Sequence, residues 1–324
     1  MPSTLSRRDM LAALSAAAGG TIFGCEAIRA QDSFDGEMMP YAAFDRLPHK
    51  TLQVGGGEIA IGFGPGELEL TQLEMLPWIE RSARAVSGYY GRFPVTKLNL
   101  LVLPTEGRGV PYGQTWGDPA AIRIRVGAEA DEAALVADWV MVHEMVHLAF
   151  PRLKMRHNWL AEGLAVYVES IARIHSGDLT EEFVWREFVE RMPRGLPKSG
   201  DQGLDNTHSW GRTYWGGAIF CLLADVEIRK QTANAKGLQH ALRAVNAAVD
   251  FNAMWPIEKA LETGEAAIGG RVLMDLYARL KDKPESPDLD ALWKELGVVS
   301  ESGALRFDSA APMAATRKAI SSAA

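Results

Sequence analysis

The sequence predicts an α+β fold, with strands confined to the N-terminal part and helices from about residue 131 onward. Residues 51–63, 97–103 and 121–126 carry the apolar or alternating patterns typical of strands. In the later part, apolar residues recur at helical spacing, and caps and breakers separate one helical segment from the next. We expect one domain over residues 31–324, made of a sheet-bearing part to residue 130, a helical part to residue 300 and a tail.

The three strand segments differ in their expected burial. Residues 51–63 alternate with glycines, which predicts strands joined by turns. Residues 97–103 are largely apolar and predict a buried strand. Residues 121–126 alternate between apolar residues and arginine, so we expect a half-exposed strand with Arg123 and Arg125 on its solvated face.

Helices are predicted from capping signals and apolar spacing. Thr71 and Glu74 form a capping box at the start of one helix, and Thr180 is expected to cap another. Residues 193–207 form a Gly/Pro/Asp-rich loop that is long enough to suggest a role at the rim of a functional site. The end of the Ala/Ser-rich tail is expected to be mobile. Further helices are expected over 236–249, 256–263, 270–281 and 288–296.

The run His143-Glu144-Met145-Val146-His147 is the strongest functional signal in the chain. It lies in a segment, 131–147, whose composition predicts one unbroken, buried helix. Histidines four residues apart stand on one face of a helix, so both imidazoles can reach one tetrahedral metal ion. Glu144 is then placed to take a proton from a metal-bound water. Burying these polar groups unpaired would be costly, and a zinc ion (Zn2+) would supply the partner.

A catalytic zinc needs a third protein ligand, for which Glu162 is the candidate. It is the only charged residue in the apolar stretch of a second predicted helix, which we expect Asn158 to cap. A lone buried carboxylate is unfavourable unless it is paired or bound to metal. The alternatives are that Glu162 points to solvent, that it pairs with Arg152 or Arg156, or that His157 is the ligand.

The His-Glu-x-x-His run followed by Trp-x-x-Glu-Gly-x-Ala-x-Tyr over residues 159–167 resembles the gluzincin metallopeptidases. The resemblance implies a thermolysin-like zincin catalytic domain, with a small N-terminal mixed sheet and helices followed by a mainly α-helical C-terminal part. It also implies zinc as cofactor and hydrolysis of peptide bonds in peptide or protein substrates. His143, His147 and Glu162 would hold the metal, and Glu144 would act as the base.

A second segment, residues 212–229, is similar to the Tyr-x-x-Gly helix of the glycyl-aminopeptidase family. This resemblance implies that the Tyr214 hydroxyl donates to the oxyanion of the tetrahedral intermediate; a packed aromatic at a helix start is the alternative. His208 would assist Tyr214 or lie on the surface. In gluzincins the edge strand before the metal helix pairs with the substrate backbone, which makes residues 121–126 the candidate strand.

The motifs do not fix the substrate specificity. Related aminopeptidases hold the free α-amine of the substrate with a glutamate on a strand before the metal helix, and the corresponding residues 112–118 contain only Asp118 as a carboxylate. Exopeptidase and endopeptidase action are both compatible with the motif. So are a zinc amide hydrolase acting on a non-peptide, cell-wall substrate and a non-catalytic zinc-binding periplasmic protein. Glu144 argues against the last, because a purely structural site has no use for a base.

The first 30 residues are expected to lie outside the fold. Ser6-Arg7-Arg8-Asp9-Met10-Leu11 is a twin-arginine pattern followed by a short apolar stretch, which indicates a Tat export signal cleaved after Ala30. The predicted location is periplasmic or secreted. A lipid anchor on Cys25, within a lipobox-like sequence, is the alternative. The apolar stretch is too short for a stable membrane span.

The composition is that of an ordinary globular protein. The 324-residue chain has 47% hydrophobic and 23% charged residues and a net charge of −7. It contains no basic run, so nucleic acid is not an expected partner. Cys221 lies in an apolar run and is expected to be a buried thiol without a disulfide. The sequence does not indicate an oligomeric state.

Overall fold

The computed structural model describes residues 34, 36, 38–250, 252–301 and 304–323. Contacts divide the chain into two units. The first contains the described residues up to Ala83 together with Val95–Met145, and the second contains Arg84–Pro94 and the residues from Val146 onward. The predicted export signal over residues 1–30, including Cys25, lies outside the described residues.

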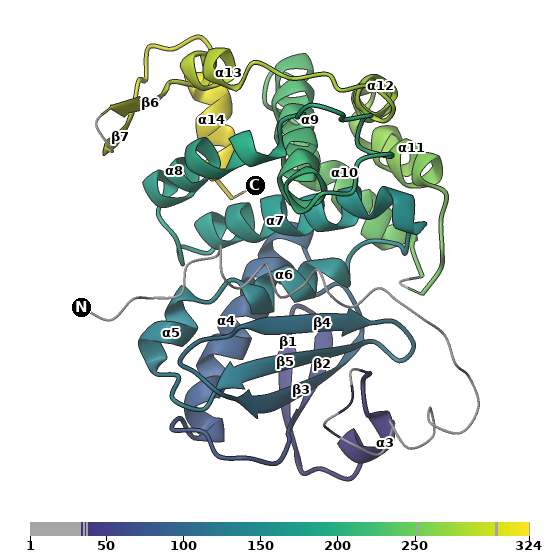
Figure 1. The fold of residues 1–324 in the computed structure, drawn as a ribbon, viewed down its shortest axis with the longest axis vertical. Helices are drawn as coiled ribbons and strands as arrows, with labels where there is room; N and C mark the ends of the chain where they lie inside the picture. The colour runs from purple at the N-terminus through teal and green to yellow at the C-terminus, as the bar shows by residue number, and fades with distance from the viewer. Residues whose placement is uncertain (1–33, 35, 37, 251, 302–303, 324) are drawn as a thin grey trace. The chain divides into compact units, whose positions relative to one another are not determined.

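The first unit is built on a five-stranded mixed sheet (Figure 1). Its strands lie in the order β1-β2-β3-β5-β4. Strands β2, β3 and β5 are parallel neighbours, and β1 and β4 run antiparallel at the two edges. The turn between β1 and β2 contains Gly55 and Gly56, both with positive φ, as the glycine-rich pattern predicted. The strands are β1 (His49–Val54), β2 (Gly57–Phe63), β3 (Lys97–Thr105), β4 (Tyr112–Trp116) and β5 (Ala121–Gly127).

Strand β5 is internal and mostly buried, which corrects two predictions. The alternating pattern predicted arginines in solvent, but Arg123 is only 3% exposed. It lies on the face of the sheet that the short helix α3 (Tyr41–Phe44) covers. Its guanidinium donates to the main-chain oxygen of Met38 at 3.0 Å and lies 5.3 Å from the ring centre of Trp116, so carbonyl and aromatic groups replace its water. The edge position expected for residues 121–126 belongs to β4.

The segment 131–147 forms two helices instead of the single helix predicted. Helix α5 (Glu132–Ala137) ends at Asp138, whose backbone is extended, and α6 (Val140–His147) follows. The Asp138 carboxylate accepts hydrogen bonds from the main-chain N–H groups of Val140 at 2.8 Å and Met141 at 3.1 Å, so it caps α6. Val136, which the single-helix prediction buried, is 50% exposed on α5.

The helix before β3 begins as predicted. In α4 (Gln72–Tyr90), the Thr71 N–H donates to Glu74 Oε2 at 2.8 Å, and the Glu74 N–H donates to Thr71 Oγ1 at 3.3 Å. These reciprocal bonds are the two halves of a capping box. The helix continues through Pro77.

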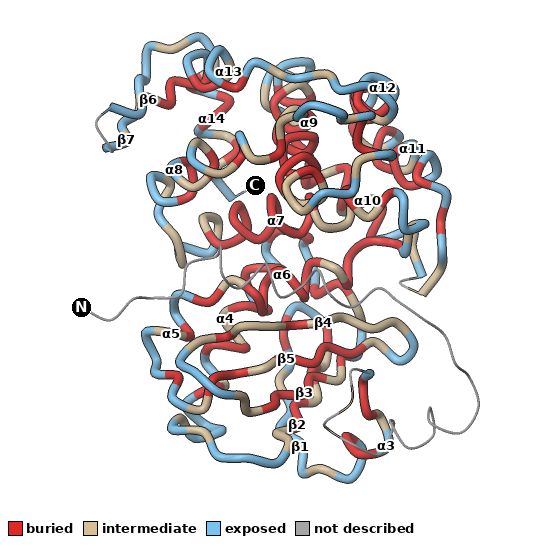
Figure 2. The backbone as a smooth tube through the Cα atoms, viewed as in Figure 1, coloured by how far each residue is buried: buried red, intermediate tan, exposed pale blue. Residues whose placement is uncertain are grey.

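The second unit is mainly helical, and α7 and α9 are buried along most of their length (Figure 2). Thr180 caps α8 as predicted, with its hydroxyl accepting from Phe183 N–H at 3.2 Å. No helix among the described residues is long and apolar enough to cross a membrane. The longer elements are α7 (Asn158–His175), α8 (Glu181–Arg191), α9 (Gly217–Gln231), α10 (Leu238–Ala248), α11 (Ile257–Ile268), α12 (Val272–Leu280), α13 (Leu289–Leu296) and α14 (Ala314–Ser321), with a hairpin of β6 (Val298–Glu301) and β7 (Ala304–Phe307).

The described end of the tail is packed, so the prediction of a mobile end is wrong there. Ile320 on α14 is fully buried, and Arg317 is 2% exposed and ion-paired with Glu181 of α8. The Trp185 indole N–H also donates to Ser321 Oγ at 3.0 Å. These contacts with α8 order a segment whose composition alone gives little sign of packing.

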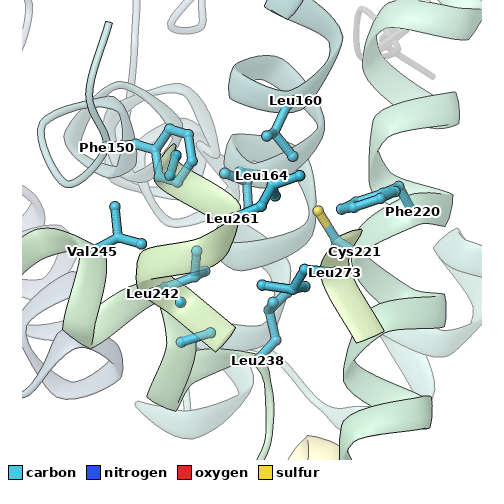
Figure 3. A pocket seen from close by; sticks show the side chains of 13 residues that line it. Phe150, Leu160, Leu164, Phe220, Cys221, Leu238, Leu242, Val245, Leu261 and Leu273 are labelled. Atoms are coloured by element: carbon cyan, nitrogen blue, oxygen red, sulfur yellow. The ribbon is translucent and has the colours of Figure 1, made fainter. Parts of the chain in front are cut away.

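A small apolar cavity of about 20 Å³ lies within the second unit (Figure 3). Its lining comes from Phe150 and from α7 and α9–α12, and it includes Leu160, Leu164 and Cys221, whose burial was predicted. A space of this size holds about one water, and an apolar lining favours leaving it dry. Leu160 and Leu164 each stand two positions from Glu162 on α7, so the cavity and Glu162 lie on different faces of that helix.

Candidate metal centre

Helices α6 and α7 bring three metal-ligating side chains together. One ligand atom from each of His143, His147 and Glu162 lies within 4.8 Å of the others. His147 Nε2 and Glu162 Oε2 are 3.6 Å apart, and these two side chains are 20% and 16% exposed. The structure therefore gathers the three residues that the sequence nominated as ligands.

The donor set and its spacing fit a zinc ion. Ligand atoms bonded to one tetrahedral zinc at about 2.0–2.2 Å stand about 3.3–3.6 Å from each other. The 3.6 Å separation between His147 Nε2 and Glu162 Oε2 matches this spacing and exceeds that of a hydrogen bond. Two imidazoles and one carboxylate leave the fourth position of a tetrahedral ion open, which is typical of catalytic zinc.

Two of the alternatives considered for Glu162, Arg156 and His157, have another partner in the structure. Arg156 Nη2 donates to Asp205 at 2.9 Å, and His157 Nδ1 lies 2.9 Å from the same carboxylate. The prediction that Asn158 caps α7 is wrong: Asn158 is the first residue of the helix, after the 3₁₀ turn η2 (Met155–His157), and the N-cap position belongs to His157, which makes no side-chain capping bond. Asn158 Nδ2 instead donates to Glu162 Oε1 at 3.5 Å. Glu162 thus has one oxygen towards Asn158 and the other towards His147.

Asp205 is a buried residue that the sequence did not single out. It is 2% exposed and accepts hydrogen bonds from His157, from the Trp159 indole at 2.9 Å and from the Tyr277 hydroxyl at 2.8 Å, besides Arg156. Burial alone would raise the pKa of Asp205, but these four hydrogen bonds outweigh it and hold that pKa below its ordinary value. The network fixes the residues at the start of α7. Its donors are distant in sequence, so no local pattern marks Asp205.

Glu144 lies on α6 and is 7% exposed. Thr115 Oγ1, on the edge strand β4, is 2.8 Å from Glu144 Oε2 and 2.9 Å from the main-chain oxygen of Glu144. Two residues before Thr115, a Cβ at Gly113 would come within 2.5 Å of Glu144 Cγ. The strand approaches the Glu144 side chain this closely because residue 113 has no side chain.

Helices α7 and α9 meet through two glycines. A Cβ at Gly163 would lie 2.2 Å from the carbonyl carbon of Gly217, and a Cβ at Gly217 would lie 1.9 Å from the main-chain oxygen of Trp159. The two helices therefore pack backbone against backbone at these glycines. Gly217 directly follows the π-helical turn η4 (Arg212–Gly216), which carries Tyr214. Short π-helical turns occur frequently at functional sites.

The remaining candidates lie around that turn or on the surface. Tyr214 is half-buried and its ring stacks on Trp210, with centroids 5.7 Å apart. The predicted rim loop contributes Asp201, which forms a buried ion pair with Arg212 of the turn at 2.8 Å. His208 is exposed, which favours a surface role over assistance to Tyr214. Asp118 is also exposed, in the turn between β4 and β5.

No family model and no curated protein matches the chain. Among solved structures, an aminopeptidase N family protein from Idiomarina loihiensis is similar, with a TM-score of 0.57 and 14% identity over 78% of this chain and 50% of that chain. An M1 zinc metallopeptidase from Deinococcus radiodurans has a TM-score of 0.51 and 16% identity, over 75% of this chain and 53% of that chain. A mutant M1 zinc metallopeptidase from the same organism, bound to a Tyr-Ser-Ala substrate, has a TM-score of 0.52 and 15% identity over the same shares.

These likenesses establish the fold. The chain shares the mixed α+β fold of M1 metallopeptidase structures and spans about half the length of those proteins. The predicted α+β class and the sheet-then-helix order are confirmed, except that the β6–β7 hairpin lies near the C-terminus. The finer likeness to glycyl-aminopeptidases has no support from these neighbours, which carry other names.

Proposed function

We propose that this protein is a zinc-dependent metallopeptidase that hydrolyses peptide bonds in peptide or protein substrates. The observation that carries the proposal is the cluster of His143, His147 and Glu162, with Glu144 held on the same helix as the two histidines. The M1-type fold supports a peptide substrate over another amide, such as one in the cell wall. A non-catalytic zinc protein would have no use for a carboxylate in the Glu144 position.

Each residue has a distinct part in the proposed reaction. His143, His147 and Glu162 would hold zinc, which when bound supplies Lewis acidity that lowers the pKa of a coordinated water and polarises the scissile carbonyl. The Glu144 carboxylate accepts a proton from the attacking water and passes it to the leaving amine. The Tyr214 hydroxyl donates to the oxyanion, a role that its placement on a braced π-helical turn supports.

Two specificities are favoured by different observations. Aminopeptidase action is suggested by the neighbours, one of which is named an aminopeptidase N family protein. Endopeptidase action is favoured by strand β4, because none of its residues, Tyr112–Trp116, is a carboxylate that could pair with a free α-amine. The two specificities predict different products from blocked peptides.

The test uses zinc-loaded protein and a mixed peptide pool, half with free and half with acetylated N-termini. Products are identified by mass spectrometry against the Glu144→Gln variant. Loss of single N-terminal residues from the free peptides alone establishes an aminopeptidase, and internal cuts in both halves establish an endopeptidase. Glu144→Gln should bind one zinc per chain and lose turnover by about 10³-fold or more. No cleavage by a zinc-loaded wild-type protein would contradict the proposal.

We also propose that the protein is exported by a twin-arginine signal and acts in the periplasm or as a secreted enzyme. The support is the Ser6–Leu11 pattern and the apolar stretch that follows it. Replacing Arg7 and Arg8 by lysine should leave the protein in the cytoplasmic fraction. Mass analysis of the mature N-terminus separates cleavage after Ala30 from a lipidated Cys25.

A further inference from the structure

The edge strand β4 presents two unlike residues on the face that the Glu144 side chain contacts. Gly113 pairs with Ile124 and Thr115 pairs with Ile122 across the antiparallel β4–β5 ladder, so all four residues lie on one face of the sheet. Gly113 gives the carboxylate stem room, as the 2.5 Å approach of a Cβ there to Glu144 Cγ shows. Thr115 supplies the hydroxyl. Strand β4 thus leaves space for Glu144 at Gly113 and offers it a hydrogen-bond donor at Thr115.

The Thr115 hydroxyl has two acceptors on a single residue. It lies 2.8 Å from the carboxylate Oε2 and 2.9 Å from the main-chain oxygen of Glu144. A hydroxyl has one proton to donate, and an ionised carboxylate is the stronger acceptor of the two. The bond to Oε2 therefore holds the end of the Glu144 side chain against strand β4. Among the described residues, no hydrogen bond reaches Oε1.

We propose that Thr115 is a positioning residue for Glu144. Its hydroxyl fixes Oε2 on strand β4 and leaves Oε1 directed to the attacking water. The inference rests on the proposed function for its catalytic meaning, whereas the contact itself is independent of turnover. Misplacing a reacting group by about 1 Å can lower a rate by about 10²-fold, so a single hydrogen bond at this oxygen is expected to affect kcat.

The test compares Thr115→Val, which keeps the shape and removes the hydroxyl, with Thr115→Ser, which keeps the hydroxyl. Thr115→Val should lower kcat by about 10- to 100-fold with KM within about twofold of wild type and zinc stoichiometry unchanged. Thr115→Ser should stay within about threefold of wild type in kcat. Equal kcat values for the Val and Ser variants would overturn the proposal, and so would a rise in KM or a loss of zinc that accounts for the effect of Val.

A second measurement works without any substrate. Thr115→Val is made in wild-type and Glu144→Ala backgrounds, and the urea midpoints of the four proteins form a double-mutant cycle. The shift caused by Val should be larger in the wild-type background, because the carboxylate partner is absent from the other. Equal shifts would show that the hydroxyl serves another partner and would overturn the proposal. A wild-type protein that cleaves no peptide would instead contradict the proposed function, while the cycle still reports on this contact.

Discussion

Helices α6 and α7 carry the candidate ligands, and a buried aspartate accepts hydrogen bonds from residues at the start of each helix, Asp138 for α6 and Asp205 for α7, but the two aspartates act differently. Asp138 serves the backbone: it accepts from two main-chain N–H groups of α6 and, at 3.0 Å, from the Trp78 indole. Asp205 serves side chains only, with donors from His157, Trp159 and Tyr277 besides Arg156. Asp138 adjoins its own helix, whereas Asp205 lies 46 residues beyond Trp159 in the chain.

Asp138 makes a local helix-capping interaction, whereas Asp205 makes tertiary interactions with side chains of other segments. A capping aspartate satisfies orphan N–H groups that any helix of this kind would have, so another capping residue can replace part of its function. An aspartate that collects side-chain donors from separate segments has no such substitute, because each donor is left buried without an acceptor when it is removed. Alanine variants at the two positions should therefore lose different amounts of unfolding free energy, and serine should restore that loss to different degrees.

The largest effect is expected from Asp205→Ala. The His157, Trp159 and Tyr277 donors would lose their acceptor inside the second unit, and unfolding free energy should fall by about 3–5 kcal/mol. Urea unfolding followed by circular dichroism measures it, with the exposed Asp282→Ala as control, expected within about 0.5 kcal/mol of wild type. Zinc affinity should fall as well, since the start of α7 loosens. A loss below about 1 kcal/mol would contradict the role given to this network.

Asp138→Ala should be milder, at about 2 kcal/mol, because a lost cap and one unpaired indole are involved. Asp138→Ser restores a capping oxygen and should recover about half of the loss. Asp205→Ser should recover little, because one short hydroxyl cannot accept four hydrogen bonds. Similar rescue by serine at both positions, measured by the same urea titrations, would remove the distinction between the two aspartates.

The contact between Gly163 of α7 and Gly217 of α9 is a third feature at which a substitution tests how the ligand-bearing helix is held. Gly163→Ala forces a Cβ against the Gly217 backbone, which cannot give way as a side chain can, and should destabilise by about 1–3 kcal/mol. The matched control is Gly88→Ala on α4, where a Cβ would meet open space. It should be neutral or stabilising by up to about 1 kcal/mol. The melting temperatures of the two variants are compared by thermal unfolding. Equal melting temperatures would contradict a tight contact at Gly163.

The smallest expected effect is on the pH dependence of stability, which should differ between the wild type and the Asp205→Asn variant. Its pKa in the folded protein lies below the value of about 3.9 for an unfolded chain. Its contribution to stability is therefore fully present above that value and is lost as pH falls through the folded pKa. Asp205→Asn cannot titrate, so the stability gap between wild type and this variant should narrow on going from about pH 5 to about pH 2.5. A constant gap in urea titrations would show that the carboxylate charge contributes nothing.

The features that the sequence predicted well are those set by neighbouring residues. The glycine turn at Gly55 and Gly56, the Thr71–Glu74 capping box and the Thr180 cap each depend on residues within one turn of chain. The ligand cluster was predictable for a related reason: a lone carboxylate in an apolar helix, here Glu162, needs a partner wherever that helix lies.

The features that the sequence missed depend on segments far apart in the chain. Arg123 alternates with apolar residues like any solvated strand residue, and only the segment around α3 makes its face a buried one. The edge position of β4 follows from strand order, which alternation does not encode. The break at Asp138 was missed because good helix composition continues on both sides of it, while the Trp78 indole that helps to hold the carboxylate comes from α4.

Cys221, in the wall of the apolar cavity, makes the motions of the second unit measurable. Burial raises the pKa of its thiol, so the native protein holds almost no thiolate there. Alkylating reagents attack the thiolate, and they can reach this sulfur only when the surrounding helices part. In a chain carrying Cys25→Ser, the rate of alkylation would therefore record how often the packed helices open, at a residue that takes no part in hydrolysis.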